Sequence, residues 1–545
     1  MPTLHWVGKD KVVNHHHDVP FRLLDKQYTF TANEGAPAPL PQNSTANRII
    51  HGDNLEALKS LLPEFEGKVN CIYIDPPYNT GNEGWVYNDA VNDPKIKKWL
   101  GQVVGKEGED LSRHDKWLCM MYPRLKLLHR LLADDGVIFV SIDDNEQATL
   151  KLVMDEIFGA GNFVANVVWR SSDNSNNDAK QFSTDHNHLV IFSKQKGWSP
   201  IKAGEQESKR SHFKNPDNDP RGPWFDGNPL NSPKPRPNLT FSLFAPDGTE
   251  IRPPANGWRW SLETINQKIS TGEIKFTPDN RSIRRRTYLA DMEALPPSTL
   301  WIDLEETGHN RQAKSEQKAV FSEIETRALF DTPKPTAFLT RLLEISVKSK
   351  GIVLDSFAGS GTTAHAVLKL NAQDGGNRRF ILCEMMDYAE TITAERVRRV
   401  MNGYGEGSKT QTGTGGAFDY YTVGAALFKE DKNLNEDVGE AAIRDYVAYT
   451  ESIPAAQQSG TDNPVCRYML GASDTALWLF YYERDKVTTL NLDFLASLNI
   501  KAFVKNGGKR PEHFIIYADK CALDKEFLTK HGITFKRIPR DITRF

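Results

Sequence analysis

The sequence predicts an α/β fold: a doubly wound, Rossmann-like sheet with an inserted domain and a smaller α/β domain after it. First, short β-branched runs alternate with segments of helical apolar spacing in two separate stretches of the chain. Second, the stretch between them interleaves prolines with Phe and Trp, as a loop-rich insertion would. Third, 545 residues are too many for one hydrophobic core, so several domains are expected.

These changes of texture divide the chain into five expected parts. A polar arm precedes the first half of the sheet, and the inserted domain precedes the second half; a small folded domain comes last. The expected bounds are 1–45, 46–200, 201–330, 331–430 and 431–545.

The first half of the sheet is expected to contain four strands and three helices. The strands are read from the apolar runs RIIHGD (48–53), NCIYID (70–75), GVIFVSID (136–143) and HLVIFSK (188–194). The helices are read from apolar residues at helical spacing in NLEALKSLLPEF (54–65), WLCMMYPRLKLLHRLL (117–132) and NEQATLKLVMDEIF (145–158). This alternation predicts parallel strands joined by crossover helices.

The same pattern resumes after the insertion. Helices are expected in KPTAFLTRLLEISV (334–347), TTAHAVLKLNA (362–372) and YAETITAERVRRVM (388–401). Strands are expected at GIVLDSFAGSG (351–361), RRFILCEM (378–385) and AFDYYTVGAALF (417–428). In the last domain, three apolar runs favour strands: ALWLFYYE (476–483), IKAFVK (500–505) and HFIIYAD (513–519).

Composition narrows the function classes. Hydrophobic content of 39% and charged content of 26% are ordinary for a globular protein. No apolar run is long enough to cross a bilayer, and the N-terminus MPTLHWVGKDKVV lacks a signal-peptide pattern. Five scattered cysteines favour the reducing cytoplasm and exclude a structural zinc pattern. The histidines at 15–17 have no companion acid at metal spacing, so we expect a solvated turn and no metal.

The stretch DPPY (75–78) ends an expected strand with an acid, two prolines and an aromatic ring. The prolines fix their own φ and hold the preceding residues extended, so the Asp75 carboxylate and the Pro76 carbonyl become a rigid pair of acceptors. Neither Pro76 nor Pro77 offers an N–H donor. Two acceptors topped by the face of Tyr78 suit an exocyclic amino group on a planar base. A strand-to-loop turn without chemistry is the alternative.

A glycine-rich turn follows another expected strand. Gly359 and Gly361 in LDSFAGSGTTA (354–364) lie between a strand and a helix, and Glu384 ends the next strand. This matches the dinucleotide-type pattern, which fits any nucleoside-bearing cofactor and is weak alone. It is not a phosphate-binding P-loop, since no lysine follows the second glycine. Ligands of open α/β sheets bind at the carboxyl ends of strands, so this turn and DPPY are expected to share one crevice.

Together these motifs resemble the amino-methyltransferases that use S-adenosyl-L-methionine, in the permuted order called the β class. DPPYNTG (75–81) precedes FAGSGTT (357–363), and a target-recognition domain is expected between them. The segments DPRGPW (219–224) and NGWRW (256–260) resemble recognition domains of modification subunits of type III restriction–modification systems. The resemblance covers most of residues 46–430.

The resemblance implies roles for individual residues. Asp75, Pro76, Pro77 and Tyr78 are implied to be catalytic. The implied cofactor residues are Asp53 at the adenine, Glu384 at the ribose, Thr332, Lys334 and Pro335 at the methionine end, and Asp355, Phe357, Gly359, Ser360 and Gly361 along the site. Because a base inside a duplex cannot reach a rigid crevice, it must be flipped out. The candidates for holding DNA are Lys209, Arg210, Arg221, Lys234, Arg236, Arg281, Arg284, Arg285 and Arg286. For the run RSIRRR (281–286), a solvated basic turn is an equal alternative.

The expected function is therefore site-specific methylation of adenine N6 in double-stranded DNA. Cytosine-N4 methylation is the chemical alternative, because that base offers the same amino geometry. Within the family that the motifs resemble, Asp rather than Ser before Pro-Pro-Tyr favours adenine. An inactive recognition or scaffold subunit and a solitary methyltransferase without a nuclease also remain open. The resemblance implies a homodimer and a separate helicase–nuclease (restriction) subunit, for which residues 431–545 would form an assembly module or merely support the core.

Overall fold

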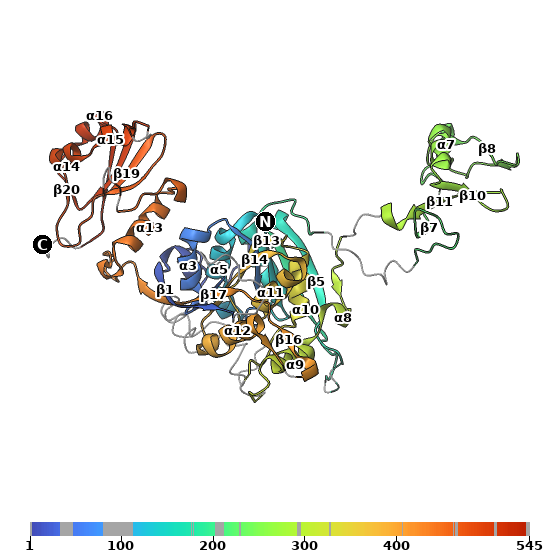
Figure 1. Cartoon of the computed structure of the whole chain (residues 1–545), viewed down its shortest axis with the longest axis horizontal. Coiled ribbons are helices and arrows are strands. Elements are labelled where there is room, and N and C mark those ends of the chain that lie inside the picture. The colour runs from blue at the N-terminus through green and yellow to red at the C-terminus, as the bar shows by residue number, and fades with distance from the viewer. Residues whose placement is uncertain are drawn as a thin grey trace. The chain divides into compact units, whose positions relative to one another are not determined.

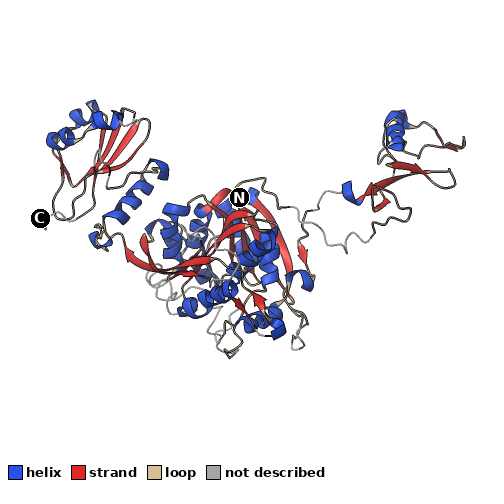
Figure 2. Cartoon of the chain, viewed as in Figure 1, coloured by secondary structure: helices blue, strands red, loops and turns tan. Residues whose placement is uncertain are grey.

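The computed structural model describes the whole chain except residues 1–2, 33–46, 80–112, 176, 178, 202–211, 228–229, 292–295, 326–328, 406, 462, 464–466, 506–508 and 541–545. The chain forms two compact units. The larger comprises Met1–Ser199 and Ser298–Phe545, and the smaller comprises Pro200–Pro297. Figures 1 and 2 show strands flanked by helices in the larger unit and short strands beside α7 (Leu262–Ser270) in the smaller.

The larger unit is organised by a ten-stranded sheet. In spatial order its strands are β1 (Arg22–Thr31), β17 (Ala417–Ala426), β2 (Arg48–His51), β14 (Asn377–Glu384), β13 (Lys350–Asp355), β3 (Val69–Ile74), β4 (Leu132–Ile142), β6 (His186–Ser193), β5 (Phe163–Arg170) and β12 (Leu300–Trp301). From β17 to β4 every neighbouring pair is parallel, whereas β1 and β6 join antiparallel. The predicted α/β sheet is confirmed, with antiparallel additions outside its parallel centre.

Helices cover both faces of this sheet, as the alternation of side chains along β3 shows. Ile72 and Ile74 belong to the core cluster that includes residues of α3 (Asn54–Phe65) and α5 (Arg113–Leu131). Tyr73 points the other way, where its ring lies 6.2 Å from that of Phe338. Phe338 belongs to α10 (Thr336–Glu344), which packs against α11 (Thr362–Asp374). Because alternate residues of a strand face opposite sides, the sheet is doubly wound.

The remaining helices of the sheet region agree with the predicted pattern. They are α6 (Gln147–Met154), continued by a π-helical turn at Asp155–Gly159, and α12 (Glu395–Asn402), preceded by a similar turn at Glu390–Ala394. Two further helices, α8 (Leu304–Thr307) and α9 (Asn310–Val320), precede α10, and β15 (Gly403–Tyr404) pairs with β16 (Gln411–Thr412).

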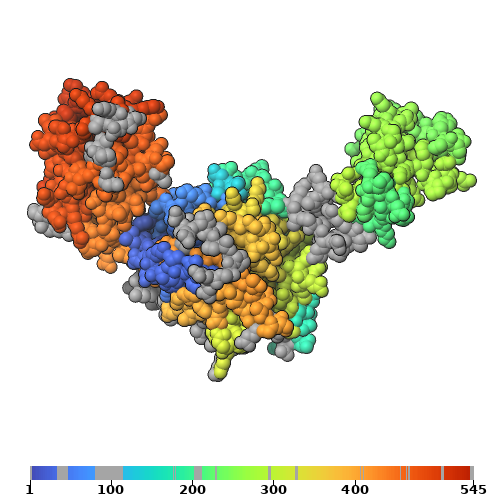
Figure 3. All heavy atoms as spheres, viewed as in Figure 1, coloured from blue at the N-terminus to red at the C-terminus, as the bar shows by residue number. Residues whose placement is uncertain are grey.

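The N-terminal segment is not the arm that its polarity predicts. Residues 3–32 form α1 (Lys9–Val12), α2 (His15–Asp18) and β1, and β1 pairs along its length with β17. In Figure 3 the blue N-terminal atoms lie beside the orange atoms of the region around β17. The histidines at 15–17 are helical and His16 is buried, so the predicted solvated turn is wrong. Burial and the neighbouring charges lower the pKa of His16 to about 4.

The smaller unit is built from short elements around its own core. It contains β7 (Trp224–Asp226), β8 (Leu243–Phe244), β9 (Glu250–Ile251), α7 (Leu262–Ser270), β10 (Ile274–Phe276) and β11 (Ile283–Tyr288), with a three-stranded sheet in the order β10-β11-β7. Trp258 and Ile265 are buried in its apolar cluster. The unit ends at Pro297, before the expected boundary at 330, because β12 pairs with β5 of the large sheet.

The C-terminal region forms a four-stranded sheet in the order β18 (Met469–Ala472), β19 (Ala476–Phe480), β21 (His513–Ala518) and β23 (Ile533–Arg537). It also contains α13 (Glu440–Thr450), α14 (Leu492–Ser497), α15 (Ile500–Lys505), α16 (Lys525–Lys530) and the pair β20 (Thr489–Leu490) and β22 (Lys520–Cys521). The strand predicted for IKAFVK is wrong, because Ile500 and Phe503, at i and i+3, pack on the core as a helix face does. Among the described residues, no helix has both the length and the apolar character needed to span a bilayer.

Candidate active site

Two loops far apart in the chain meet because β3 and β13 are neighbours. The strands pair in parallel, with Val353 opposite Cys71 and Leu354 opposite Ile72. One residue after Leu354 comes Asp355, and one residue after Ile74 comes Asp75, so both acids leave the sheet at its carboxyl edge. The shared crevice predicted for DPPY and FAGSG is therefore present in the fold.

A cleft of about 900 Å³ opens between these loops. It is lined by residues from the ends of β3, β13 and β14, from the segment before α10, and from the start of α3. They are Asn54, Tyr73, Asp75, Pro77, Phe330, Thr332, Pro333, Lys334, Leu339, Asp355, Ser356, Phe357, Ala358, Gly359, Ser360, Thr362, Thr363, Glu384, Met385, Met386 and Tyr388. Its mixture of apolar and polar lining residues is that of a small-molecule site.

The Asp75 carboxylate has one occupied oxygen and one open one. Its Oδ2 accepts a hydrogen bond from the Lys334 ammonium. Its Oδ1 is buried and has no hydrogen-bond partner among the described residues. Leaving a buried carboxylate oxygen unpaired costs free energy, so this atom could accept a hydrogen bond from a further donor.

Tyr78 completes the same corner. The Lys334 Nζ lies 5.1 Å from the centroid of the Tyr78 ring, so Lys334 contacts the carboxylate and faces the ring. Burial, and then the charge of Asp75, raise the pKa of Tyr78 well above its ordinary value, so the phenol stays neutral. Asn187 Nδ2 lies 3.5 Å from the Tyr78 hydroxyl oxygen.

The loop that contains DPPY is anchored by hydrogen bonds to Trp117 of α5 and to the buried Glu146. The Trp117 Nε1–H donates to the Pro77 carbonyl at 2.7 Å. Asn79 has a positive φ of 60° and donates through Nδ2 to Glu146 Oε1, a fully buried carboxylate. The Pro77 carbonyl is thus engaged within the protein, and Pro77, not Pro76, lines the cleft.

The glycine turn is fixed by backbone geometry and by a buried arginine. Gly359 and Gly361 have φ angles of 52° and 78°, which side-chain-bearing residues rarely adopt. A Cβ on Gly361 would lie 3.0 Å from the Thr393 carbonyl oxygen, so its constraint comes from the protein and not from the cleft. Arg396, fully buried, donates to Ser360 Oγ at 2.9 Å and to Thr362 Oγ1 at 2.8 Å.

Two further acids face the cleft. Glu384 accepts the Gly359 N–H at 2.8 Å and the Met386 N–H at 3.0 Å, which aims its carboxylate at the end of β14. Asp355 accepts from the Phe357 N–H at 3.0 Å and from the Thr363 hydroxyl. Burial raises the pKa of Asp355 to about 7, against the lowering effect of these hydrogen bonds, and also raises the pKa of Glu384.

Most of the implied cofactor residues lie on the cleft, and three do not. Asp53 caps α3 by accepting from the Leu55 and Glu56 N–H groups, and its neighbour Asn54 lines the cleft instead. Gly361 and Pro335 also lie outside the lining. Sequence reasoning missed Phe330 and Tyr388, whose rings are 5.7 Å apart, because neither residue belongs to a recognisable motif.

The cleft fits the adenosyl cofactor that the motifs imply. Glu384 stands at the end of the strand after the glycine turn, with lone pairs left for ribose hydroxyl groups. Phe357, Phe330 and Met385 offer apolar surface for a base. The Asp355 carboxyl group lines the same cleft and, when ionised, would attract a sulfonium cation.

The three consecutive arginines Arg284, Arg285 and Arg286 are each paired with an acid of the smaller unit. Arg286 has a side chain only 11% exposed; its Nη1 lies 2.7 Å from Asp219 Oδ2, and its guanidinium lies 3.8 Å from the Trp224 ring centroid. Arg285 pairs with Glu273 at 2.7 Å, and Arg284 pairs with Asp226. The run at 281–286 is thus mainly strand β11 and not the solvated turn offered as its alternative.

The other basic candidates differ in their surroundings. Arg221 pairs with Asp291 at 2.7 Å and stacks 3.9 Å above the Tyr288 ring centroid. Lys234, Arg236 and Arg281 are exposed, and no ion pair within the described part of the chain engages them. Lys209 and Arg210 lie outside the described residues.

A corner of hydrogen-bond acceptors beside a cleft for a nucleoside cofactor is the arrangement found in α/β group-transfer enzymes. The chain belongs to the DNA methylase family, which it matches over residues 69–395. It is 31% identical over 367 residues to the type II methyltransferase M.KpnI of Klebsiella pneumoniae, covering 63% of this chain and 82% of that protein.

Two relatives are modification subunits. The chain is 37% identical over 354 residues to the Mod subunit of the type III restriction-modification enzyme StyLTI of Salmonella typhimurium, covering 62% of this chain and 52% of that protein. It is 32% identical to the EcoPI Mod subunit of Escherichia phage P1, covering 75% of this chain and 66% of that protein. The chain thus spans about half to two thirds of the length of these two relatives.

Proposed function

We propose that this protein methylates the N6 amino group of a flipped-out adenine at specific sites in double-stranded DNA. The methyl donor is S-adenosyl-L-methionine. The observation that carries the proposal is the buried Oδ1 of Asp75, which no described residue engages, next to a cleft suited to the cofactor. A carboxylate oxygen that lacks a donor, set beside a proline carbonyl and an aromatic face, matches an amino group on a planar base.

Each residue around Asp75 has a separate role in binding and activating the amino group. Lys334 holds Oδ2 of Asp75, so the carboxylate is oriented and Oδ1 is left to accept one amino hydrogen. The Pro76 carbonyl accepts the other hydrogen, and the Tyr78 ring stacks on the base. These two hydrogen bonds draw the nitrogen lone pair out of conjugation and toward the cleft. An N–C bond would form as the C–S bond of the sulfonium breaks, and the surplus N–H proton would pass along the hydrogen bond to Asp75 Oδ1 and from there to solvent. S-adenosyl-L-methionine supplies an electrophilic methyl group.

Methyl transfer from labelled S-adenosyl-L-methionine to unmethylated plasmid DNA tests the proposal. Digestion to nucleosides followed by mass spectrometry identifies the modified base. We expect N6-methyladenine. N4-methylcytosine would support the alternative base, and no methylated nucleoside would support an inactive recognition subunit.

The similarity to type III Mod subunits supports a setting in restriction–modification, with a restriction subunit as partner and a homodimer as the working form. The described cysteines are free, which supports a cytoplasmic location. Residues 431–545 are proposed as the assembly module. Part of this region also supports the core, because the Tyr449 hydroxyl on α13 donates to Glu66 at 2.6 Å and accepts from Arg130 at 2.8 Å.

Light scattering on the full chain, alone and with a candidate restriction subunit, tests this setting. A mass of two chains and a larger complex with the added subunit are expected. A monomer that ignores the restriction subunit would support a solitary methyltransferase.

A further inference from the structure

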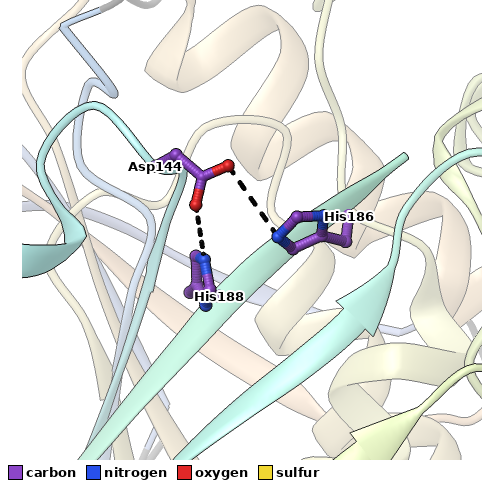
Figure 4. A group of neighbouring side chains, drawn as sticks. All are labelled: Asp144, His186 and His188. Carbon is purple, nitrogen blue, oxygen red and sulfur yellow. Dashed lines mark hydrogen bonds and ion pairs between the residues drawn. The ribbon is translucent and has the colours of Figure 1, made fainter. Parts of the chain in front are cut away.

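Three side chains with metal-binding atoms converge beside the active site but outside its cleft. Asp144 follows β4, and His186 and His188 are the first and third residues of β6. β4 and β6 are antiparallel with Ile142 opposite His188, so two residues further on Asp144 comes level with His186. Residues i and i+2 of a strand share a face, so both imidazoles point to the same side. Figure 4 shows the carboxylate between the two rings.

The distances between the potential ligand atoms are close to those between the ligands of a bound metal ion. His188 Nε2 lies 2.8 Å from Asp144 Oδ1, and His186 Nε2 lies 3.8 Å from Asp144 Oδ2, too far for a hydrogen bond. One potential ligand atom from each residue lies within 4.8 Å of the others. Ligands about 2.1 Å from a tetrahedral zinc ion are roughly 3.4 Å apart, a value between the two histidine–aspartate distances. Small side-chain shifts would therefore suffice.

The surroundings also fit a metal. His188 is largely buried and Asp144 is largely exposed, with side-chain exposures of 12% and 63%, so an ion could enter from solvent and keep water ligands. A histidine that binds metal through Nε2 must carry its proton on Nδ1 and donate it to an acceptor. Asn166 Nδ2 lies 3.1 Å from His188 Nδ1, and the Asn166 Oδ1 is buried without a partner among the described residues. Rotation of this amide would present Oδ1 as the needed acceptor.

We propose that Asp144, His186 and His188 bind a divalent transition metal ion of the zinc class. Two imidazoles and one carboxylate favour zinc, cobalt or nickel over the oxygen-preferring magnesium and calcium ions. The ion ties the loop after β4 to the start of β6. Asn187, between the two histidines, lies 3.5 Å from the Tyr78 hydroxyl, so the ion also stiffens the strand that borders the catalytic corner. It takes no part in methyl transfer, since none of its ligands lines the cleft.

Competition between the full-length protein and a chromophoric chelator for Zn²⁺ tests the site, with Co²⁺ absorption as a second readout. One ion per chain is expected. His186→Ala and Asp144→Asn change exposed or half-exposed side chains, so the fold is retained, and each should weaken binding at least about tenfold. Asn166→Ala should weaken Zn²⁺ binding by about tenfold, because it removes the acceptor for the Nδ1–H of His188.

His17→Ala is the matched control, because His17 is an exposed histidine in the other histidine-rich segment. It should leave Zn²⁺ affinity unchanged. Unaltered affinity in both His186→Ala and Asp144→Asn, loss of binding in His17→Ala, or equal competition by Mg²⁺ would overturn the site. Absence of an intense visible Co²⁺ band in the parent protein would overturn its tetrahedral form.

Discussion

Charged residues have opposite environments in two regions of the molecule. One is the corner formed by Asp75, Tyr78 and Lys334 in the larger unit, and the other is strand β11 of the smaller unit. At Asp75 one carboxylate oxygen is engaged by Lys334, and the other is buried with no partner in the part of the chain that the structure describes. At Arg286 the guanidinium is enclosed by Asp217, Asp219 and the Trp224 ring, so its charge is balanced within the unit. A buried charge with an open atom marks a ligand site, whereas a buried charge with its partners present stabilises the fold.

Replacing Asp75 is expected to reduce methyl transfer more than any other change considered below. Asp75→Asn keeps the shape but replaces the carboxylate acceptor, and we expect methyl transfer to fall on the order of 10³-fold. Cofactor affinity, measured by calorimetry, should change little because Asp75 acts on the amino group. Near-normal turnover in this variant would remove Asp75 from the chemistry.

Arg286 is expected to stabilise the smaller unit, because its buried charge has its partners present. Arg286→Ala leaves Asp217 and Asp219 without their cation, and we expect a loss of about 3 kcal/mol in the unfolding free energy of the smaller unit. Urea unfolding followed by tryptophan fluorescence measures it, since Trp224 lies on Arg286. Arg284→Ala is the control: its side chain is 63% exposed, so a change within about 0.5 kcal/mol is expected. Equal effects would show that Arg286 is not a structural residue.

Asp355 gives a pH dependence of known sign. Its folded pKa of about 7 lies above the ordinary 3.8, so its contribution to stability is complete below the ordinary value and is lost as pH rises toward 7. Relative to Asp355→Asn, the parent protein should lose stability by about 1.4 kcal/mol per pH unit within this window. Urea unfolding of both proteins without cofactor at pH 5 and pH 8 measures the difference. Parallel stabilities would mean that Asp355 does not titrate there.

The exposed cations of the smaller unit should give the smallest effect. Replacing Lys234 and Arg236 by serine should weaken DNA binding and flatten its salt dependence by about one unit of logarithmic slope for each phosphate that the variant no longer neutralises. Fluorescence anisotropy over a series of salt concentrations measures the slope. Arg284→Ser serves as the ion-paired control and should keep the parent slope. A flatter slope in the control than in the double variant would reverse the assignment of DNA contacts.

Local patterns predicted the parts of the molecule that depend on neighbouring residues. The strands that end at Asp75 and Asp355 were predictable from their apolar runs, and their meeting followed from the rule that ligands bind at carboxyl ends. Pairings between distant segments were not predictable. The β1–β17 pairing joins residues about 390 positions apart, and the partners of Arg286 come from a loop about 70 residues earlier. A run of arginines looks the same whether its acids are near or absent.

We infer that the loops after β3 and β13 form one site for cofactor and target base. A crystal structure of the protein with a non-reactive analogue of S-adenosyl-L-methionine tests it most directly. We predict the ribose hydroxyls within about 3 Å of the Glu384 carboxylate, and the methyl-bearing position directed toward Asp75. An analogue bound outside this cleft, or one whose reactive end points away from Asp75, would contradict the claim.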